Sequence, residues 1–485
     1  MNNQLIEGLQ SLTPQECERF DAFLRSPYHN QRIRSIHCWE FFHHFAPKFA
    51  SDQISVEKLG KHLFAETSFR RQAVLDEISH LYRLLKAFWE MEGLQADPLL
   101  QRSLRLKQLS ERRLNRLYQI ERKSAQKFMD QQPLNREHYY QFELAWASLD
   151  NEHFGRQQLR TVDQGLAQKL HALDVYYLSL LLRESCEALN RQHILNSHYE
   201  IPLLPALVEL LESSAHSYRQ VPVIEVYYQI YLSLQDSASQ EEYEALITSL
   251  RNYRDDFTLA ETRAMYKYAQ NFCIRQINRG HTEYDQRLFE LFQELLNTGI
   301  IFTQKNLAHT DYKNIATIGL RVKALSWVES FLEQYKQNIV PAFRDNVYAY
   351  CRAALEVEKG NRPQAIRLLQ FISHTDVHYQ ISARQLLLKI YYHEQDLEAV
   401  LYTLDAFRHF LQRNRELPSS RKKQHLRFLT IFRPICLLQE RLPTYKPTEA
   451  RQRLVKLRQK LEGSEALPNR AWLLEQLEDM EASIS

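Results

Sequence analysis

The sequence predicts an all-α protein in which an N-terminal helical bundle is followed by a solenoid of paired helices. Apolar residues recur at the spacing of amphipathic helices along nearly the whole chain. Glycine is scarce, because only 10 of the 485 residues are Gly, whereas about 7% is usual in proteins. The turns of β-hairpins and the loops that bind phosphates both need glycine. An all-β fold and a nucleotide-binding α/β fold are therefore disfavoured.

The first 95 residues are expected to form a compact helical domain, 1–95. One helix is expected over 13–25, because Thr13 and Glu16 can form a capping box with Pro14 at the first helical position. This helix should end at Ser26, since a residue that precedes a proline avoids the α region. Three more helices are expected: one rich in aromatic residues around Trp39, one over 55–64 and one over 69–92.

The next segment, 96–222, is expected to contain a basic helix and irregular helical hairpins. The basic helix is predicted over 101–130, where nine Lys and Arg residues stand against three acidic residues. Two or three further helices are expected between 135 and 192. Prolines at 202, 205 and 222 then mark the passage into the second half of the chain.

Residues 223–413 are expected to hold five consecutive helical hairpins, and 414–485 a C-terminal helical cap. The predicted helix pairs are 223–235 with 240–253, 258–278 with 283–297, 305–323 with 325–339, 344–359 with 362–373, and 379–393 with 396–413. Ala365 and Ala399 stand near the starts of two second helices and are 34 residues apart. A fixed period of this kind is typical of a repeat array.

These two alanines resemble the small residue that opens the second helix of a tetratricopeptide repeat (TPR). The resemblance covers about residues 345–412, whereas Trp327 and Val328 stand at the equivalent place upstream. It implies a TPR-like α-α hairpin solenoid, coiled as a right-handed superhelix with a concave groove.

The whole chain also resembles an uncharacterised family of bacterial TPR-like helical proteins. The residues that carry this resemblance are Leu12-Thr13-Pro14, Phe20, Phe23-Leu24, Ser26-Pro27-Tyr28 and Asn30. The resemblance supports the fold and implies no activity.

Several functional classes are disfavoured by what the sequence does not contain. The first ten residues have neither the basic start nor the apolar core of a signal peptide. The most apolar stretch, 173–182, is too short to span a bilayer. The six cysteines form no CxxC pair, which indicates reduced thiols in a cytoplasmic protein with no membrane partner.

No phosphate-loop, dinucleotide-binding, zinc-protease or serine-hydrolase motif occurs in the sequence. The chain is therefore expected not to be an enzyme and to need no cofactor. His374, Asp376 and His378 have a spacing that could suit a metal on a helix. They fall in an expected loop with no visible fourth ligand, so solvated histidines are the preferred interpretation.

The expected function is that of a protein-protein interaction scaffold or adaptor, whose partner and oligomeric state the sequence leaves open. The predicted partner-binding groove consists of Tyr350, Val357, Arg384, Leu388, Tyr391 and Tyr392. Arg and Tyr often anchor interfaces, and an arginine on this face would be out of place in a dry core. The alternative is that the two tyrosines pack between repeats while Arg384 pairs with a carboxylate.

A nucleic-acid-binding regulator is the alternative function. Residues 55–92 resemble a helix-turn-helix unit, but the polar face of the second helix mixes basic and acidic residues, whereas a DNA-reading face should be basic. The tract 408–460 carries fifteen Lys and Arg against three Glu, although the whole chain has a net charge of only +3. The acidic residues after 461 are expected to fold onto this tract as a solenoid cap.

Overall fold

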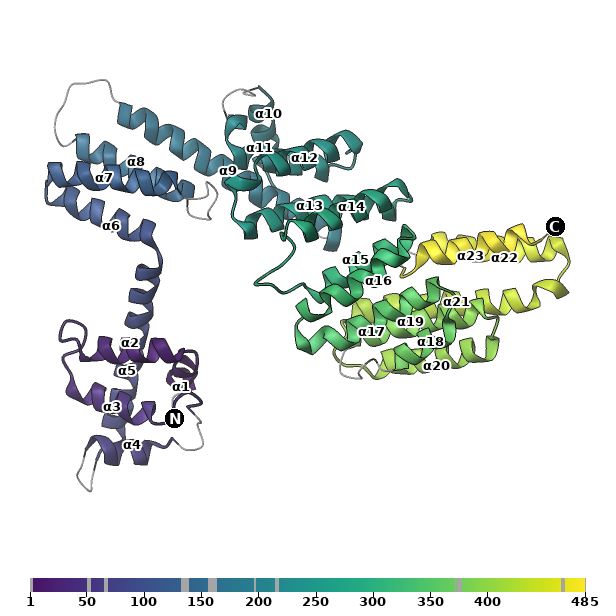
Figure 1. Ribbon diagram of the computed structural model, residues 1–485, viewed down its shortest axis with the longest axis horizontal. Coiled ribbons are helices and arrows are strands. Elements are labelled where there is room, and N and C mark those ends of the chain that lie inside the picture. Colours follow the sequence, from purple (N-terminus) through teal and green to yellow (C-terminus); the bar gives the residue numbers. More distant parts are fainter. Residues whose placement is uncertain are drawn as a thin grey trace. The chain divides into compact units, whose positions relative to one another are not determined.

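The computed structural model confirms the all-α class. It describes residues 3–49, 54–64, 69–131, 139–155, 164–195, 198–213, 218–370, 372, 377–463 and 467–484. The chain is 81% helical, with 23 α-helices and no β-strand in these described ranges (Figure 1). The chain folds into two compact units. Unit 1 comprises 1–184, 202–224 and 255–257, and unit 2 comprises the rest.

Five helices surround the first core of unit 1. They are α1 (Asn3–Gln10), α2 (Pro14–Arg25), α3 (Ile33–His43), α4 (Val56–Leu63) and α5 (Arg71–Ala96). The predicted capping box is confirmed, since the Thr13 side chain accepts from the Glu16 backbone and the Glu16 carboxylate accepts from the Thr13 backbone. In the core, the ring of Phe20 lies 5.0 Å from Trp39 and 5.2 Å from Phe88 between centroids.

The prediction of a single basic helix over 101–130 is wrong, because the chain turns back in the middle of this range. The structure has α6 (Pro98–Glu111) and α7 (Asn115–Asp130), which pack against each other. Arg113 takes a left-handed conformation with φ of 55°. The amide of Leu114 then donates to the carbonyl of Leu109, which closes the end of α6. Non-glycine residues rarely adopt positive φ, so the sequence carries no signal for this turn.

Three further helices complete the middle of the chain. They are α8 (Tyr139–Gly155), α9 (Gln164–Leu195) and α10 (Leu204–Ser213). Helix α8 packs against α6 through Trp146, whose indole N–H donates to the Ser103 hydroxyl over 2.6 Å. Helix α9 is 32 residues long, the longest of the described helices.

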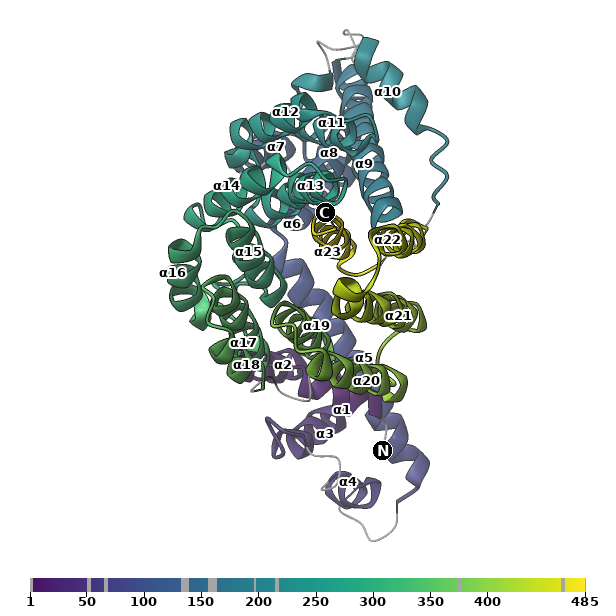
Figure 2. The same cartoon turned by 90° about the vertical axis from the view of Figure 1, so that its right-hand side faces the viewer.

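The ten helices of the five predicted hairpins are all present, and three more helices follow them. The pairs are α11 (Pro222–Leu234) with α12 (Gln240–Asn252), α13 (Leu259–Asn278) with α14 (Glu283–Asn297), α15 (His309–Arg321) with α16 (Leu325–Tyr335), α17 (Pro341–Glu358) with α18 (Arg362–Gln370), and α19 (Val377–His393) with α20 (Leu397–Arg413). The last helices are α21 (Ser419–Arg441), α22 (Pro447–Glu462) and α23 (Arg470–Ala482). Figure 2 shows α13 to α20 following one another in chain order.

In two hairpins a small residue allows the paired helices to approach each other closely. This residue lies on the second helix of one hairpin and on the first helix of the other. Ala365 is fully buried where α18 meets α17. In the α15–α16 hairpin the small residue is on the first helix instead, because a Cβ on Gly319 would lie 2.5 Å from the Val328 Cγ2 atom. A bulky residue at the start of α16 is therefore accommodated by a glycine opposite. This explains why Val328 stands where the repeat pattern calls for alanine.

Gly319→Ala is expected to lower the stability of unit 2 despite the higher helix propensity of alanine. Overpacking costs about 1–3 kcal/mol, whereas the propensity gain is at most about 1 kcal/mol. The matched control is Gly93→Ala in α5, whose added Cβ would meet no atom within 4 Å. Thermal unfolding of both variants measures the difference. A Gly319→Ala protein as stable as the control would contradict the close approach to Val328.

Candidate binding groove

One hydrophobic core joins α19, α20, α21, α22 and α23. Its buried members include Leu388 and Tyr392 of α19, Phe407 of α20, Phe432 of α21 and Leu473 of α23. The last three helices therefore share their core with the last predicted repeat.

An aromatic cluster closes the interface between α19 and α23. The ring centroid of Tyr392 lies 5.4 Å from Phe432 and 5.5 Å from Trp472, and the latter two rings are 5.3 Å apart. The Lys389 ammonium lies 4.9 Å from the Trp472 ring. Burial lowers the pKa of Lys389 to about 8, and Glu475 opposes this shift only in part. The ammonium thus loses much of its hydration and is stabilised by the ring face.

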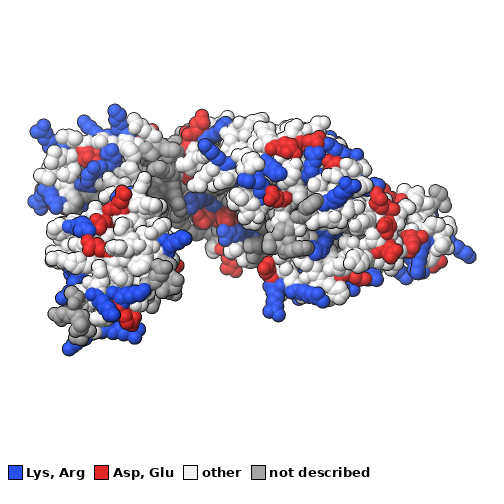
Figure 3. Space-filling view, turned by 60° about the horizontal axis from the view of Figure 1, so that its bottom comes forward, with Lys and Arg blue, Asp and Glu red and all other residues white. Residues whose placement is uncertain are grey.

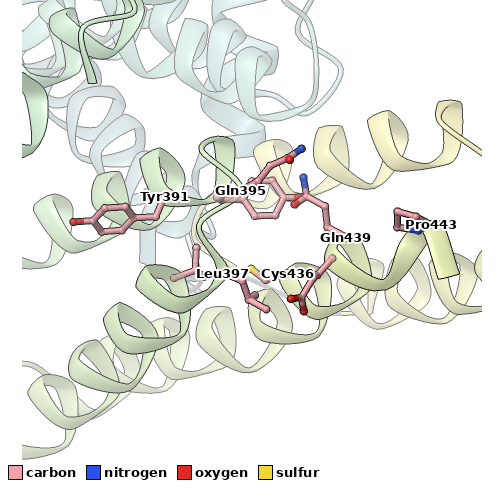
Figure 4. Close-up of a pocket in the computed structure, with 9 residues that line it drawn as sticks. Tyr391, Gln395, Leu397, Cys436, Gln439 and Pro443 are labelled. Atoms are coloured by element: carbon pink, nitrogen blue, oxygen red, sulfur yellow. The ribbon is translucent and has the colours of Figure 1, made fainter. Parts of the chain in front are cut away.

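A hollow of about 260 Å³ opens next to this cluster. Its lining residues are Tyr391, Tyr392, Gln395, Leu397, Val400, Cys436, Gln439, Glu440 and Pro443. Figure 4 shows Tyr391 at one end of the hollow and Pro443 at the other, with Cys436 between them. The hollow is therefore formed by the turn between α19 and α20 on one side and the end of α21 on the other.

A second hollow of about 710 Å³ continues from the first. The two share Tyr392, Gln395, Gln439 and Pro443. The other residues that line the second hollow are His393, Leu442, Tyr445, Pro447, Ala450, Gln476, Asp479, Met480, Ser483 and Ile484. We refer to the two hollows together as the C-terminal groove.

Local chain geometry positions the walls of the C-terminal groove. Gln395 takes a left-handed conformation with φ of 57°, which ends α19 sharply. The side chain of Asp396 then accepts from the Ala399 amide and caps α20. On the opposite wall, α21 ends in a 3₁₀ turn, Leu442–Thr444, that contains Pro443. The groove is thus the space left between two helix ends that turn abruptly.

The lining of the C-terminal groove combines apolar surface with amide side chains. Gln395, Gln439 and Gln476 each carry both a donor and an acceptor, as a peptide backbone does. Cys436 supplies the only thiol among the lining residues. Burial raises its pKa, which keeps the thiol protonated and weakly nucleophilic. The lining also includes Glu440, His393 and Asp479. The groove can therefore offer hydrogen bonds, apolar contact and charge, which suits binding of a peptide segment.

The structure brings together only two of the six residues predicted to line a partner-binding groove. Tyr391 is half-buried and lines the first hollow, and Tyr392 lines both hollows while its ring is buried in the core. Leu388 is fully buried, so it cannot offer surface to a partner. The prediction missed that α21 and α23 cover this part of α19, because a repeat pattern contains no information about what packs behind it.

The other three predicted residues lie outside the C-terminal groove. The guanidinium carbon of Arg384 lies 4.2 Å from the centre of the Phe410 ring, and one of its nitrogens donates to the Gln380 carbonyl. Within the described part of the chain no carboxylate forms an ion pair with Arg384. Tyr350 receives the Lys313 ammonium on its ring at 4.6 Å. Val357 is half-buried on α17.

Sequence reasoning missed most of the groove residues, including Gln395, Gln439 and Gln476. They belong to elements that are far apart along the chain and that meet only through the shared core. Glutamines on amphipathic helices are common, so no motif marks these three. The one available signal was the apolar spacing of α21 and α23, which indicates two helices that must cover a neighbour.

Two features of the sequence favoured nucleic-acid binding, the helix-turn-helix-like unit 55–92 and the basic tract 408–460. Helices α4 and α5 pack on each other, and the turn 65–68 between them is outside the described residues. In the basic tract, α23 packs on α22, and Arg458 pairs with Glu481 over 3.1 Å. Basic and acidic side chains are interspersed on the face drawn in Figure 3. Residues 408–427 nevertheless carry seven Lys and Arg with a single Glu.

The metal alternative lies largely outside the described residues, which exclude His374 and Asp376. Among the residues that are described, no group of three or more His, Cys, Asp or Glu side chains is arranged to hold a metal ion. In the same ranges no helix is both long and apolar enough to cross a membrane.

Comparison of the chain with protein-family models, with curated proteins and with solved structures finds no match.

Substitutions of the two adjacent tyrosines are expected to differ strongly in their effect on stability. Tyr392→Ala should cost about 3–5 kcal/mol, because it removes a buried ring from the aromatic cluster. Tyr391→Ala should cost about 1 kcal/mol, because that ring is only half-buried. Urea unfolding of the full chain measures both. Equal losses would show that Tyr391 is as much a packing residue as Tyr392.

Proposed function

We propose that this chain is a non-catalytic helical-repeat protein that acts as a scaffold or adaptor and binds a peptide segment of a protein partner in the C-terminal groove. The observation that carries the proposal is the groove lining, which contains both amide side chains and apolar surface. Amides can pair with the backbone of a bound segment, and the aromatic and aliphatic walls can hold its side chains.

A TPR-like, right-handed solenoid is part of the proposal, and the stacking of successive hairpins supports it. Helix α15 packs on α17, and α17 packs on α19, so the first helices of successive hairpins are neighbours. Solenoids use the surface formed by such rows of helices for extended binding. A fold alone does not determine a function. The proposed function therefore depends on the groove and not on the repeats. We also propose that the protein is cytoplasmic.

Nucleic-acid binding is the second candidate, and the segment 408–427 favours it. Arg421, Lys422 and Lys423 are among the first five residues of α21, and the first turn of this helix contains no acidic residue. Cations at the N-terminus of a helix are unfavourable, because the helix dipole is positive there. A bound polyanion would relieve this repulsion and release counterions.

Capture from a lysate of the native host distinguishes the two candidates. The full chain is expected to retain one protein partner after nuclease treatment, and Tyr391→Ala should weaken its retention at least about tenfold, which corresponds to about 1.4 kcal/mol. Tyr402→Ala is the matched control, because Tyr402 lies outside the groove and is 78% exposed.

Equal retention by the two tyrosine variants would contradict binding in the C-terminal groove. Recovery that disappears after nuclease treatment would favour the second candidate. In that case, replacing Lys422 and Lys423 by Ala should make binding to nonspecific DNA less sensitive to salt. The slope of the logarithm of the binding constant against the logarithm of the salt concentration should become shallower by roughly 0.7–0.9 for each phosphate that is no longer neutralised.

A further inference from the structure

Helix α9 is apolar on two opposite faces, and only one of them is covered. The covered face contributes to the buried interior of the protein. Its buried residues up to the end of unit 1 are Ala172, Val175, Leu178, Ser179 and Leu182. A surface helix normally carries polar residues on the side away from its core.

The opposite face of α9 instead presents a row of large apolar side chains to solvent. The exposed fractions are 44% for Leu166, 54% for Leu170, 44% for Leu173, 48% for Tyr177 and 38% for Leu180. We refer to these five residues as the α9 seam. Single exposed leucines are ordinary, but a continuous row of them indicates an interaction surface.

The α9 seam follows the heptad rule of a coiled coil. Its members are spaced four, three, four and three residues apart, which assigns Leu166, Leu173 and Leu180 to d positions and Leu170 and Tyr177 to a positions. In this register the buried residues of the covered face fall at b, c and f. The face that a coiled coil offers to its partner is therefore the face that α9 leaves open.

We propose that α9 pairs with α9 of a second copy of this chain as a parallel, two-stranded coiled coil along the α9 seam. A heptad seam is complementary to itself, because each a or d side chain fits between the same side chains of an identical helix. The proposal is independent of the function assigned to the C-terminal groove, which lies in unit 2, whereas the seam lies in unit 1.

Charges beside the seam favour the parallel orientation. Lys169 is at a g position and Asp174 is at the e position five residues later. In a parallel pair the g residue of one helix faces this e residue of the other, which brings opposite charges together on both sides. An antiparallel pair sets g against g and e against e, so it would not place Lys169 opposite Asp174. Asp174 is held in place by Tyr218, whose hydroxyl donates to its carboxylate over 2.8 Å.

The seam is short, so the dimer is expected to be reversible. Five core positions fall below the roughly three to four heptads that sustain a stable coiled coil. We therefore expect a dissociation constant of roughly micromolar order, and a dimer fraction that rises with protein concentration.

Sedimentation equilibrium of the full chain tests the pairing. The wild-type chain should shift from monomer to dimer between roughly 0.1 and 100 μM. Leu170→Glu places two carboxylates opposite each other at an a position of the seam and should raise the dissociation constant at least about tenfold. Leu259→Glu is the matched control, because Leu259 is 52% exposed on α13 and lies outside the seam. Circular dichroism of each variant checks that its helices are intact.

Cysteine cross-linking tests the orientation. Leu170→Cys should form a disulfide-linked dimer under mild oxidation, because the two copies of an a position face each other only in a parallel pair. Gln168→Cys, at an exposed f position, should not. All six native cysteines are buried, so they should not contribute to the cross-link.

A chain that stays monomeric at 100 μM would overturn the proposal and leave the seam for a helix of another protein. A dimer that Leu170→Glu does not weaken would place the interface elsewhere. A dimer that Leu170→Cys cannot cross-link would overturn the parallel pairing.

Discussion

The structure depends on one constraint, which is that each helix must bury its apolar stripe against other helices because the described part of the chain contains no sheet to pack on. Close approach between helices then decides which residues can stand at each interface. Gly319 makes room for Val328, and Ala365 makes room for α17. The same requirement makes α21 to α23 part of the fold, since their leucines and phenylalanines complete the core begun by α19 and α20.

The C-terminal groove follows from this packing. Successive hairpins expose the turns that join their helices, and the abrupt ends of α19 and α21 leave a space that α22 and α23 cover only partly. Several groove residues, such as Tyr392, Cys436 and Met480, belong to the continuous core, which holds them in place. Preorganised side chains lose little conformational entropy on binding, which is consistent with the role proposed for the groove.

Local patterns predicted much of the fold and little of the site. Apolar periodicity located the helices and hairpins, and Thr13 with Glu16 predicted the start of α2, because these signals act within one or two turns. The turn at Arg113 was missed, since its left-handed conformation has no marker in the residue type. Leu388 and Tyr392 were expected on an open face but are buried. Their covering helices are distant in sequence, and only tertiary packing brings them together.

Hydrogen exchange across the C-terminal helices tests most directly whether α19 to α23 form one core that shapes the groove. The amides of α23 (Arg470–Ala482) should be protected to within about tenfold of those of α21, because Leu473, Leu477 and Met480 share the buried cluster with Phe428 and Phe432. Exchange of α23 at the rate of an unfolded peptide, with α21 still protected, would contradict the account. The last helix would then be a separate tail, and the larger hollow of the groove would lose one of its walls.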